Sequence, residues 1–497
     1  MALGGQVGSQ IKIRTSNGWL LASVRNHKQD ARYPNGIIAD VDFLGEGEES
    51  ALNGKIKAFR RGVTYYPISG TPVHPATSED LGQIYASDGR SSIQIGNVYP
   101  TRNIRAGLYI DALLGKHFAL LGSTGTGKST SAALILHRIC EHAPEGHVIM
   151  IDPHGEYAAA FGGAGVVLDV SNLQMPYWLM NFEEHCEILL TSRGADRQID
   201  AEILAKCLQE ARQKNRMAER LGKVTVDSPV PYMLSDLSTI LSNEMGKLDK
   251  GHTSAPYLRI RNKLDELKTD PRYQFMFSGM LVADTMTDFI TMLFRMPSGG
   301  RPISIIDVSG VPSDITTTVV AVLSRLVFDF AVWAREEQTR PILLVCEEAH
   351  RYVPNEKNAD GSSVGRVLSR IAKEGRKYGI SLGLITQRPS DLAEGVLSQC
   401  GTIIAMRLNN DRDQAFVRAA MPEGARGFLD SIPALRNREC IICGEGVTIP
   451  IRVTFDELEE HKRPASSDPS FTELWRTSGG ETDMVQRTVQ RWRAQGR

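Results

Sequence analysis

A glycine-rich stretch near residue 122 has the residue types and spacing of a phosphate-binding loop. It reads Gly122-Ser-Thr-Gly-Thr-Gly-Lys-Ser-Thr130 and fits G-x-x-x-x-G-K-[ST] at every fixed position. Glycines let backbone N–H groups turn toward phosphate oxygens, and a following helix N-terminus adds its positive dipole end. We expect Lys128 to reach the outer phosphates and Ser129 to bind magnesium. The predicted nucleotide-binding residues are Gly122, Ser123, Thr124, Gly125, Thr126, Gly127, Lys128, Ser129 and Thr130.

The segments on either side of this loop support that interpretation. Residues 117–121 are a short apolar run of strand character. After the loop, apolar residues recur at the i, i+3, i+4, i+7 spacing of a buried helix face. A glycine-rich turn that matches by accident is the alternative, but it would not need a strand before it and a helix after it. The chain is therefore predicted to bind ATP with Mg²⁺. The apolar helix positions are Ala132, Ile135, Leu136 and Ile139.

Two adjacent acids follow a second apolar run at residues 342–346. The carboxyl end of a parallel strand is where metal and water chemistry belong in an α/β sheet. Glu347 is predicted to hold the magnesium shell, and Glu348 to polarise the attacking water near the γ-phosphate. Glu347 stands where Asp is usual and reaches one methylene further. Two solvated acids at a strand end are the alternative, which the intact phosphate loop disfavours.

The next strand and the helix before it supply two more candidates. Gln387 follows the run at residues 381–385, where an amide can sense the γ-phosphate and orient water; a turn residue is the alternative. Residues 365–379 predict a helix with a basic C-terminal end. Arg376 is predicted to be an arginine finger that reaches the γ-phosphate of an adjacent subunit, with Arg370 in reserve. Cations that only stabilise the helix dipole are the alternative.

A further polar patch follows the strand at residues 147–151. Asp152 and Glu156 are predicted to lie close to the γ-phosphate and its water. His154 is expected to be packed or hydrogen-bonded. We assign the patch only an accessory role.

The arrangement of apolar runs predicts the fold of the middle of the chain. From about residue 106, short apolar runs alternate with helical patterns, which indicates a doubly wound α/β core with parallel strands. The segment from about residue 175 to about residue 300 interrupts this alternation, and its pattern predicts a helical insertion. Residues 354–363 are too polar and glycine-rich to pack, and predict a mobile loop. The strand candidates are 147–151, 303–306, 342–346 and 381–385, and the helix face of the insertion is Ile199, Ile203, Cys207 and Ala211.

The two ends of the chain have different patterns. Residues 1–105 carry alternating runs and turn signals at 10–14, 20–24 and 92–96, which predict a small β-barrel or sandwich that serves docking or assembly. Residues 461–497 form a tail with two short amphipathic patterns. Exposed tryptophan is unfavourable, so we expect the tail to dock on its own core or on a neighbouring subunit. The two apolar faces are Phe471, Leu474 and Trp475, and Val485, Val489 and Trp492.

Composition limits the remaining classes of function. Hydrophobic residues make up 41% of the 497 residues, enough for large cores, and a net charge of −1 gives no overall basic field. Among the seven cysteines, Cys440 and Cys443 form a lone C-x-x-C that fits a buried strand better than a zinc site. No signal peptide and no apolar run of about 18 residues are visible. We expect a soluble, cytoplasmic protein without a membrane partner.

Five blocks of sequence, taken together, resemble the HerA family. This family comprises hexameric DNA translocases of the HerA–FtsK branch of RecA-like ATPases. The resemblance covers residues 1–460 and implies a RecA-like P-loop ATPase core, preceded by a β-barrel of the HAS-barrel type. The blocks are residues 117–129, 151–157, 346–354, 373–379 and 386–389.

The resemblance also implies an activity and partners. Such proteins form six-membered rings, hydrolyse ATP between subunits and pump double-stranded DNA through a central channel. Their partners are a NurA-type nuclease in end resection, or Sir2-like and other effectors in anti-phage defence. Lys116 matches a basic position that in relatives approaches the nucleotide. By position, the resemblance gives phosphate and magnesium binding to Lys128 and Ser129, the acid pair to Glu347 and Glu348, the sensor to Gln387 and the finger to Arg376.

Three interpretations of the whole chain remain at this point. The first is an ATP-driven DNA translocase, for which backbone contacts repeated by six subunits suffice. The second is a ring scaffold in which ATP controls assembly with an effector enzyme, with little DNA pumping. The third is a secretion or conjugation ATPase, which the absence of a membrane segment disfavours. Candidate pore residues are Arg351, Lys357 and Arg366.

Overall fold

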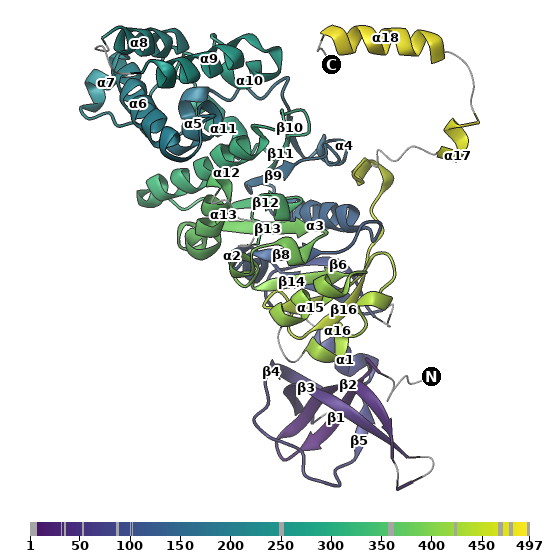
Figure 1. Cartoon of the computed structure of the whole chain (residues 1–497). Helices are drawn as coiled ribbons and strands as arrows, with labels where there is room; N and C mark the ends of the chain where they lie inside the picture. Colours follow the sequence, from purple (N-terminus) through teal and green to yellow (C-terminus); the bar gives the residue numbers. More distant parts are fainter. Residues whose placement is uncertain are drawn as a thin grey trace.

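A computed structural model describes most of the chain and contains two separate β-sheets (Figure 1). Five strands form the smaller sheet, near the N-terminus, and eleven form the larger one. The described residues are 7–30, 32–33, 36–51, 54–85, 89–99, 101, 103–247, 253–355, 362–421, 425–465, 471–476 and 481–494.

The large sheet is parallel over seven strands and antiparallel over the remaining four. All four strands predicted for the middle of the chain are confirmed, and they lie in its parallel part. In sheet order the strands are β10 (Gly165–Leu168), β11 (Ile303–Asp307), β9 (Val148–Asp152), β12 (Ile342–Cys346), β13 (Ile380–Thr386), β8 (Phe118–Leu121), β14 (Thr402–Met406), β15 (Glu439–Gly444), β16 (Ile451–Phe455), β6 (Ser92–Val98) and β7 (Arg105–Tyr109).

Both faces of the parallel strands are buried, as the continuous apolar runs predicted. In β8, Phe118 and Leu120 join one core, and Ala119 and Leu121 join the other. Helix α3 packs on the first face, and helices α12 and α13 pack on the second together with the helical insertion. This is a doubly wound arrangement, and it fixes β8, β12 and β13 at the centre of the sheet. The helices are α3 (Lys128–His142), α12 (Thr316–Trp333) and α13 (Ser363–Glu374).

Cys440 and Cys443 lie in strand β15, as predicted. Because side chains alternate along a strand, residues three apart point to opposite faces. Cys440 is accordingly buried in one core and Cys443 in the other. No group of three potential metal-ligating side chains occurs in the described ranges. The pair is therefore part of the packing of the sheet.

The helical insertion is confirmed between β10 and β11. The predicted face of α6 is confirmed only in its second half, where Cys207 and Ala211 are buried. Ile199 is 48% exposed, whereas Asp200, Leu204 and Leu208 are buried. Positions four apart drift by about 40° per step around a helix with 3.6 residues per turn, so the predicted set does not stay on one face. Its helices are α5 (Phe182–Leu189), α6 (Gly194–Gln213), α7 (Arg216–Leu221), α8 (Leu234–Gly246), α9 (Ala255–Thr269), α10 (Gln274–Phe277) and α11 (Met286–Phe294).

The N-terminal region forms an antiparallel sheet in the order β4-β3-β2-β1-β5. The predicted strands at residues 10–14 and 20–24 belong to it, but the one at 92–96 is β6 of the large sheet. The chain therefore leaves the small sheet after β5 and enters the large sheet at β6, which begins at residue 92. Closure into a HAS-type barrel and the domain division at residues 105 and 460 stay predictions. The strands are β1 (Gln10–Thr15), β2 (Gly18–Gln29), β3 (Ile37–Glu49), β4 (Ile56–Arg61) and β5 (Val73–Pro75).

One long apolar helix was not anticipated. Within the described residues, the helical segment Thr316–Glu336 is the one stretch long and apolar enough to cross a membrane by length and composition. Most of it is buried, since α12 packs between the sheet and the insertion. A core helix of this kind passes the same test. The remaining short helices are α1 (Ser78–Ile84), α2 (Ile110–Gly115), α4 (Ala158–Phe161), α14 (Glu394–Leu397), α15 (Asp411–Ala420) and α16 (Arg426–Leu429).

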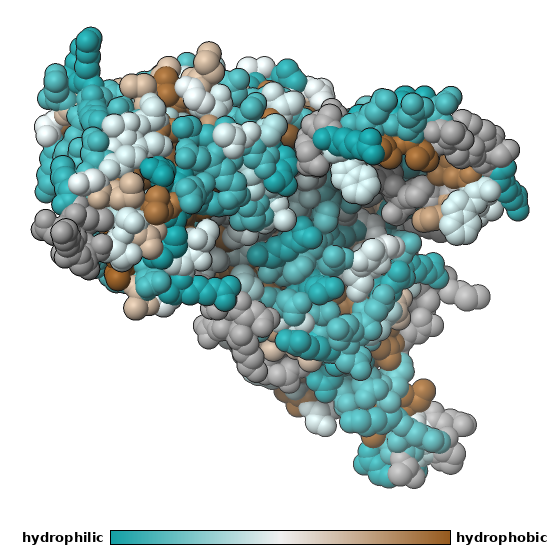
Figure 2. Space-filling view, turned by 45° about the horizontal axis from the view of Figure 1, so that its top comes forward, coloured by the Kyte–Doolittle hydropathy of each residue, from teal (hydrophilic) through white to brown (hydrophobic). Residues whose placement is uncertain are grey.

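The C-terminal tail contains helices α17 (Phe471–Leu474) and α18 (Glu481–Ala494). Trp475 is 83% exposed and Trp492 is 74% exposed, so docking of these side chains on the chain's own core is wrong. Figure 1 places α18 apart from the core, and apolar side chains are visible on this part of the surface in Figure 2. Docking on a neighbouring subunit stays a prediction.

Candidate nucleotide-hydrolysis site

The phosphate loop lies between β8 and α3, at the carboxyl edge of the parallel strands. The beginning of the loop is held by backbone at the ends of neighbouring strands: the Gly122 N–H donates to the Thr386 carbonyl at 3.2 Å, and the Ser123 N–H to the Arg407 carbonyl at 2.9 Å. Gly127 has φ of 90°, a left-handed conformation that favours glycine. It precedes α3, and no side chain in the described residues caps this helix. The first N–H groups of α3 therefore remain available for phosphate oxygens.

Two buried acids and the loop lysine meet at this edge. Glu347 and Glu348 directly follow β12, and Lys128 begins α3. The Lys128 Nζ lies 3.6 Å from Glu347 Oε1 and 3.5 Å from Glu348 Oε1. All three side chains are buried. The structure therefore brings the predicted lysine and both predicted acids together in one place.

Glu347 has the features expected of a magnesium ligand. Burial raises its pKa to about 7, against the opposing effect of Lys128. Its Oε2 is buried without a hydrogen-bond partner in the described chain. Carboxylate and hydroxyl oxygens are ligands that Mg²⁺ prefers, so Ser129 and Glu347 fit this ion. When bound together with ATP, the ion would neutralise charge on the phosphate oxygens.

Tyr157 is a member of the site to which the sequence analysis gave no role. Its hydroxyl donates to Glu347 Oε1 at 3.1 Å and is also hydrogen-bonded to Ser129. Tyr157 is fully buried, and burial raises the pKa of its phenol well above the usual value. The hydroxyl thus joins the two predicted magnesium ligands. Its signals in the sequence were its place five residues after a strand end and its position in the block 151–157.

Glu348 is held by several contacts in an unusual backbone conformation. Its φ of 50° and ψ of 43° are left-handed, which costs a non-glycine residue on the order of 1–3 kcal/mol. Gln387 Nε2 donates to Glu348 Oε2 at 3.3 Å, and His350 Nδ1 lies 3.3 Å from the same oxygen. Burial lowers the pKa of His350. This left-handed backbone conformation directs the Glu348 carboxylate toward Lys128 and Gln387.

The predicted sensor also contacts the phosphate loop. The exposed Thr124 hydroxyl donates to Gln387 Oε1, so the Gln387 amide bridges the loop and Glu348. The preceding residue, Thr386, has its hydroxyl 2.9 Å from His350 Nδ1. His350 and Thr386 were missed by the sequence analysis. The ends of β12 and β13 are neighbours, which puts these side chains in reach of one another.

The accessory patch after β9 supports the site only indirectly. Asp152 accepts hydrogen bonds from the backbone N–H groups of His154, Gly155 and Tyr157 at 2.9–3.1 Å. Burial raises the Asp152 pKa, and its carboxylate is occupied by these contacts. His154 is exposed, and Glu156 is half-buried. The role of this loop in the structure is to hold Tyr157 in place.

Arg376 lies at the opposite edge of the sheet from the phosphate loop of the same chain. It belongs to the 3-10 helix η6 (Gly375–Tyr378), directly before β13 begins. The phosphate loop lies beyond the other end of β13, which is about 20 Å long at 3.3 Å per residue. Arg376 is exposed and has no ion pair within the described chain. The reserve candidate, Arg370, contacts Glu374 and lies over the Phe328 ring at 4.4 Å.

None of the other basic candidates forms an ion pair with Glu347 or Glu348 in the described residues. Lys116 precedes β8 at the amino edge and forms an ion pair with Glu445, so it does not approach the nucleotide site of its own chain. Arg351 is exposed. Arg366 pairs with Glu183 of the insertion. Lys357, like most of the predicted loop 354–363, lies outside the described residues.

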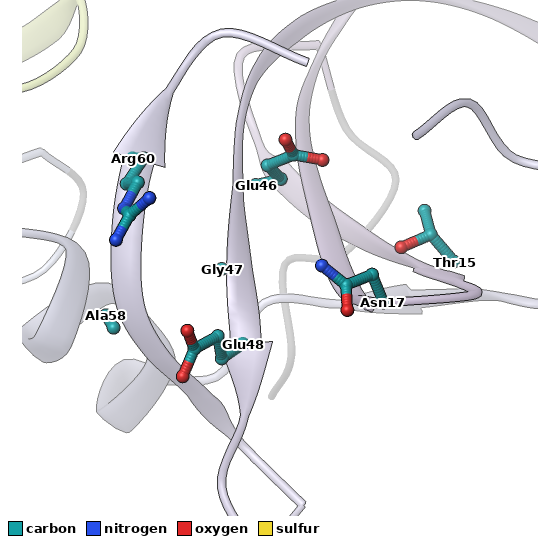
Figure 3. Close-up of a pocket in the computed structure, with 7 residues that line it drawn as sticks. All are labelled: Thr15, Asn17, Glu46, Gly47, Glu48, Ala58 and Arg60. Atoms are coloured by element: carbon teal, nitrogen blue, oxygen red, sulfur yellow. The ribbon is translucent and has the colours of Figure 1, made fainter. Parts of the chain in front are cut away.

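A separate polar pocket lies on the N-terminal sheet (Figure 3). Its residues come from β3 and β4, from the end of β1 and from the turn between β1 and β2. It has neither a glycine-rich loop before a helix nor an acid pair at the end of a parallel strand. It therefore lacks the features of a second triphosphate site. The lining residues are Thr15, Asn17, Glu46, Gly47, Glu48, Ala58 and Arg60.

Comparisons with known proteins show which proteins this chain resembles. The family model described as "Helicase HerA, central domain" matches residues 93–327, which include the phosphate loop. The DNA double-strand break repair helicase HerA of Pyrococcus furiosus is 27% identical over 90% of this chain and 85% of its own length. The HerA of Sulfolobus acidocaldarius is 24% identical over 86% of this chain and 80% of its own length. The chain is therefore similar to HerA proteins over most of its length. It is an ATPase, as the phosphate loop and the acid pair predicted.

Solved structures agree on the fold. VirB4 of Thermoanaerobacter pseudethanolicus gives a TM-score of 0.52 at 16% identity, covering 76% of this chain and 99% of its own. The plasmid coupling protein TrwB, in complex with a non-hydrolysable GTP analogue, gives 0.50 at 13% identity, covering 80% and 95%. These likenesses concern the arrangement of the α/β core alone.

Proposed function

We propose that the chain is an ATP-driven translocase and helicase for double-stranded DNA, and that six copies form its working ring. In this proposal it acts in the cytoplasm with a partner nuclease or effector enzyme, in DNA end processing or anti-phage defence. The names of its relatives in Pyrococcus and Sulfolobus, double-strand break repair helicases, support DNA as the substrate.

One observation carries the proposal: the charges needed for hydrolysis occur in two separate places. Lys128, Glu347 and Glu348 converge at the carboxyl edge, whereas Arg376 is exposed at the amino edge, beyond the reach of its own site. Head-to-tail contacts bring unlike surfaces of two copies together and close into a ring when the rotation permits. In such a ring, each copy would offer Arg376 to its neighbour and receive one in return.

The residues have complementary parts in the reaction. Glu348 would orient the attacking water and accept its proton, while Gln387 positions the water against the γ-phosphate. Lys128 and the neighbour's Arg376 would stabilise negative charge on the transferred phosphoryl group. Ser129 and Glu347 would hold the magnesium ion. Gln387 donates a hydrogen bond to Glu348. A bound γ-phosphate would compete with Glu348 for the same amide, so binding of the γ-phosphate would free the Glu348 carboxylate.

The near-neutral charge of the chain is compatible with DNA tracking. Contacts to the DNA backbone are independent of sequence, and a ring repeats each of them six times in this proposal. Both described candidates are exposed, but Arg366 pairs with Glu183 whereas Arg351 forms no ion pair within the described residues, so Arg351 is the better candidate. Weak DNA binding by an isolated subunit follows from a net charge of −1.

The test is ATP turnover by the full chain with and without duplex DNA, together with ATP-dependent displacement of a third strand from the duplex. We expect duplex DNA to stimulate turnover, and ATP to be required for displacement. Lys128→Ala is the inactive control. A fully assembled ring with turnover unaffected by DNA and no displacement would contradict the translocase. It would favour the ring scaffold, in which ATP controls an effector enzyme.

A further inference from the structure

Helix α5 of the insertion holds the two core helices α12 and α13 through acidic side chains. Glu184 forms a two-pronged ion pair with Arg325 of α12, with N–O distances of 2.8 and 2.9 Å. Glu183 pairs with Arg366 of α13. We refer to the acids Glu183, Glu184 and Glu187 as the α5 clamp. The clamp connects the insertion to the helix that leads to Arg376.

Glu187 makes the contacts of the clamp that fix the beginning of α13. Its Oε1 accepts the Ser363 N–H at 2.9 Å, and its Oε2 accepts the Ser363 hydroxyl at 2.7 Å. The same Oε2 accepts the Thr318 hydroxyl of α12 at 3.2 Å. The first N–H groups of a helix lack partners within the helix, and a carboxylate there is stabilised by the dipole. Hydrogen bonds to a charged acceptor are the stronger kind.

Helix α13 transmits this anchorage to its other end. It runs from Ser363 to Glu374 and continues directly into η6, which contains Arg376. Twelve residues of helix span about 18 Å, and such a rod tilts as a unit. The His117 Nε2 contacts the Ala372 carbonyl at 3.0 Å, close to Arg376. The helix is therefore supported at both ends, by the insertion at its start and by the residue before β8 near its finish.

We propose that Glu187 is a positioning residue for ATP hydrolysis in the adjacent subunit. By fixing the start of α13 to the insertion, it sets where Arg376 meets the neighbour's nucleotide. This inference rests on the proposed role of Arg376 across the subunit contact. It gives the helical insertion a part in hydrolysis, although no hydrogen bond or ion pair joins its described residues to the acids or the phosphate loop.

The inference predicts that Glu187→Ala behaves like a loss of Arg376 and unlike a loss of Lys128. Because misplacement by about 1 Å can lower a rate about 100-fold, we expect turnover to fall by about 10- to 100-fold. ATP binding should stay unchanged, since the variant's own phosphate loop is intact. Glu187→Gln keeps one acceptor oxygen and should recover part of the activity. Glu202→Ala, which removes an exposed acid of α6, is the matched control and should have no effect.

Mixed rings separate the two sides of the subunit contact. Glu187→Ala subunits mixed with Lys128→Ala subunits should regain turnover, because the second variant supplies a correctly placed Arg376. Glu187→Ala mixed with Arg376→Ala should not regain it. Ser363→Ala, a milder change that removes only the hydroxyl donor, should repeat the pattern with a smaller loss. Thermal unfolding and ring mass are measured on every variant.

Two outcomes would overturn the inference and separate it from the proposal on which it rests. If Lys128→Ala and Arg376→Ala complement each other but Glu187→Ala is not rescued by Lys128→Ala, the positioning role alone is wrong. If Glu187→Ala is rescued only by Arg376→Ala, Glu187 acts on its own nucleotide site and the inference also fails. If Lys128→Ala and Arg376→Ala do not complement, the role of Arg376 fails and that of Glu187 with it.

Discussion

The carboxyl edge and the amino edge of the same parallel strands differ in how their charges are satisfied. At the carboxyl edge, Lys128, Glu347 and Glu348 are buried, and the lysine lies within 3.6 Å of both acids. At the amino edge, Arg376 is exposed and carries no ion pair within the described chain. Lys116, on the same side, is paired with Glu445 at the surface.

This difference follows from the energetics of burial. A charge is buried at acceptable cost only when a partner compensates it, so the three buried groups must be assembled within one chain. An exposed arginine is solvated by water and needs no such partner, so it remains accessible to a second copy of the chain. In the proposed ring, the two edges are half-sites of one reaction: the carboxyl edge is preformed in each chain, and Arg376 of a second copy completes it.

The largest expected effect comes from removing the cation of the amino edge. Arg376→Ala should lower ATP turnover by about 10³- to 10⁵-fold, because the transition-state charge loses its partner. ATP binding, measured with a fluorescent analogue, should be retained. Lys373→Ala removes a neighbouring exposed cation of α13 and should leave turnover unchanged. Turnover at the normal rate in Arg376→Ala would contradict this role and leave Arg376 as a cation that only stabilises the end of its helix.

The next effect concerns the carboxyl edge. Glu348→Gln removes the proposed general base, so turnover should fall by about 10²- to 10⁴-fold while ATP still binds. Steady-state hydrolysis and equilibrium nucleotide binding measure the two quantities. The matched control is Glu445→Gln, which changes an acid at the other edge and should be close to normal. An equal loss of turnover in Glu348→Gln and Glu445→Gln would contradict the assignment of hydrolysis to the carboxyl edge.

Several features of this edge could be predicted from the sequence, and others could not. Local patterns suffice for β8, β12, β13 and the phosphate loop, since an apolar run and a glycine-rich turn are encoded by neighbouring residues. The bridge from Thr124 through Gln387 to Glu348 depends on the sheet order, which joins segments more than 200 residues apart. Tyr157 was missed for the same reason, because its importance arises only where the ends of β9 and β12 meet.

The N-terminal region and the insertion teach a similar lesson. The run at residues 92–96 was correctly predicted as a strand, but its pairing with β16 depends on a segment far along the chain. In α6, Asp200 is buried because Arg259 of α9 pairs with it at 2.7 Å, and no local pattern predicts that partner. Periodicity identifies an element, whereas its neighbours decide which side of it is buried.

A smaller effect tests how the magnesium ligands are held. Tyr157→Phe removes the hydroxyl between Glu347 and Ser129, and loss of such a supporting contact typically weakens metal affinity about 10- to 100-fold. A Mg²⁺ titration of ATP turnover, and the Mg²⁺-dependent rise in melting temperature with ATP, should both shift to higher concentration. Tyr352→Phe is the control, because the Tyr352 hydroxyl is buried without a partner in the described residues. Unchanged Mg²⁺ dependence in Tyr157→Phe would contradict this role.

The smallest effect is a pH dependence at the amino edge. Burial lowers the pKa of His117 from its usual 6.5, and the charge of Arg376 contributes in the same direction. The folded state then binds fewer protons than the unfolded state just below pH 6.5, so the free energy of unfolding should fall as pH drops below that value. The contribution of one such group is at most about 1.4 kcal/mol per pH unit.

His117→Asn tests this dependence, because asparagine tolerates the left-handed backbone at this position, where φ is 56°. Denaturant unfolding of the variant should show a shallower decline of stability between about pH 6.5 and 5 than the unchanged chain. A slope identical to that of the unchanged chain would show that His117 does not titrate in this range.

The most direct test of the two half-sites is ATP turnover per subunit across a dilution series, with the mass of the assembly measured in parallel. We predict that turnover rises and falls with the population of associated subunits and is lost in the monomer, where Arg376 has no neighbouring nucleotide to reach. A monomer that hydrolyses ATP at the full rate of the assembly would contradict the account.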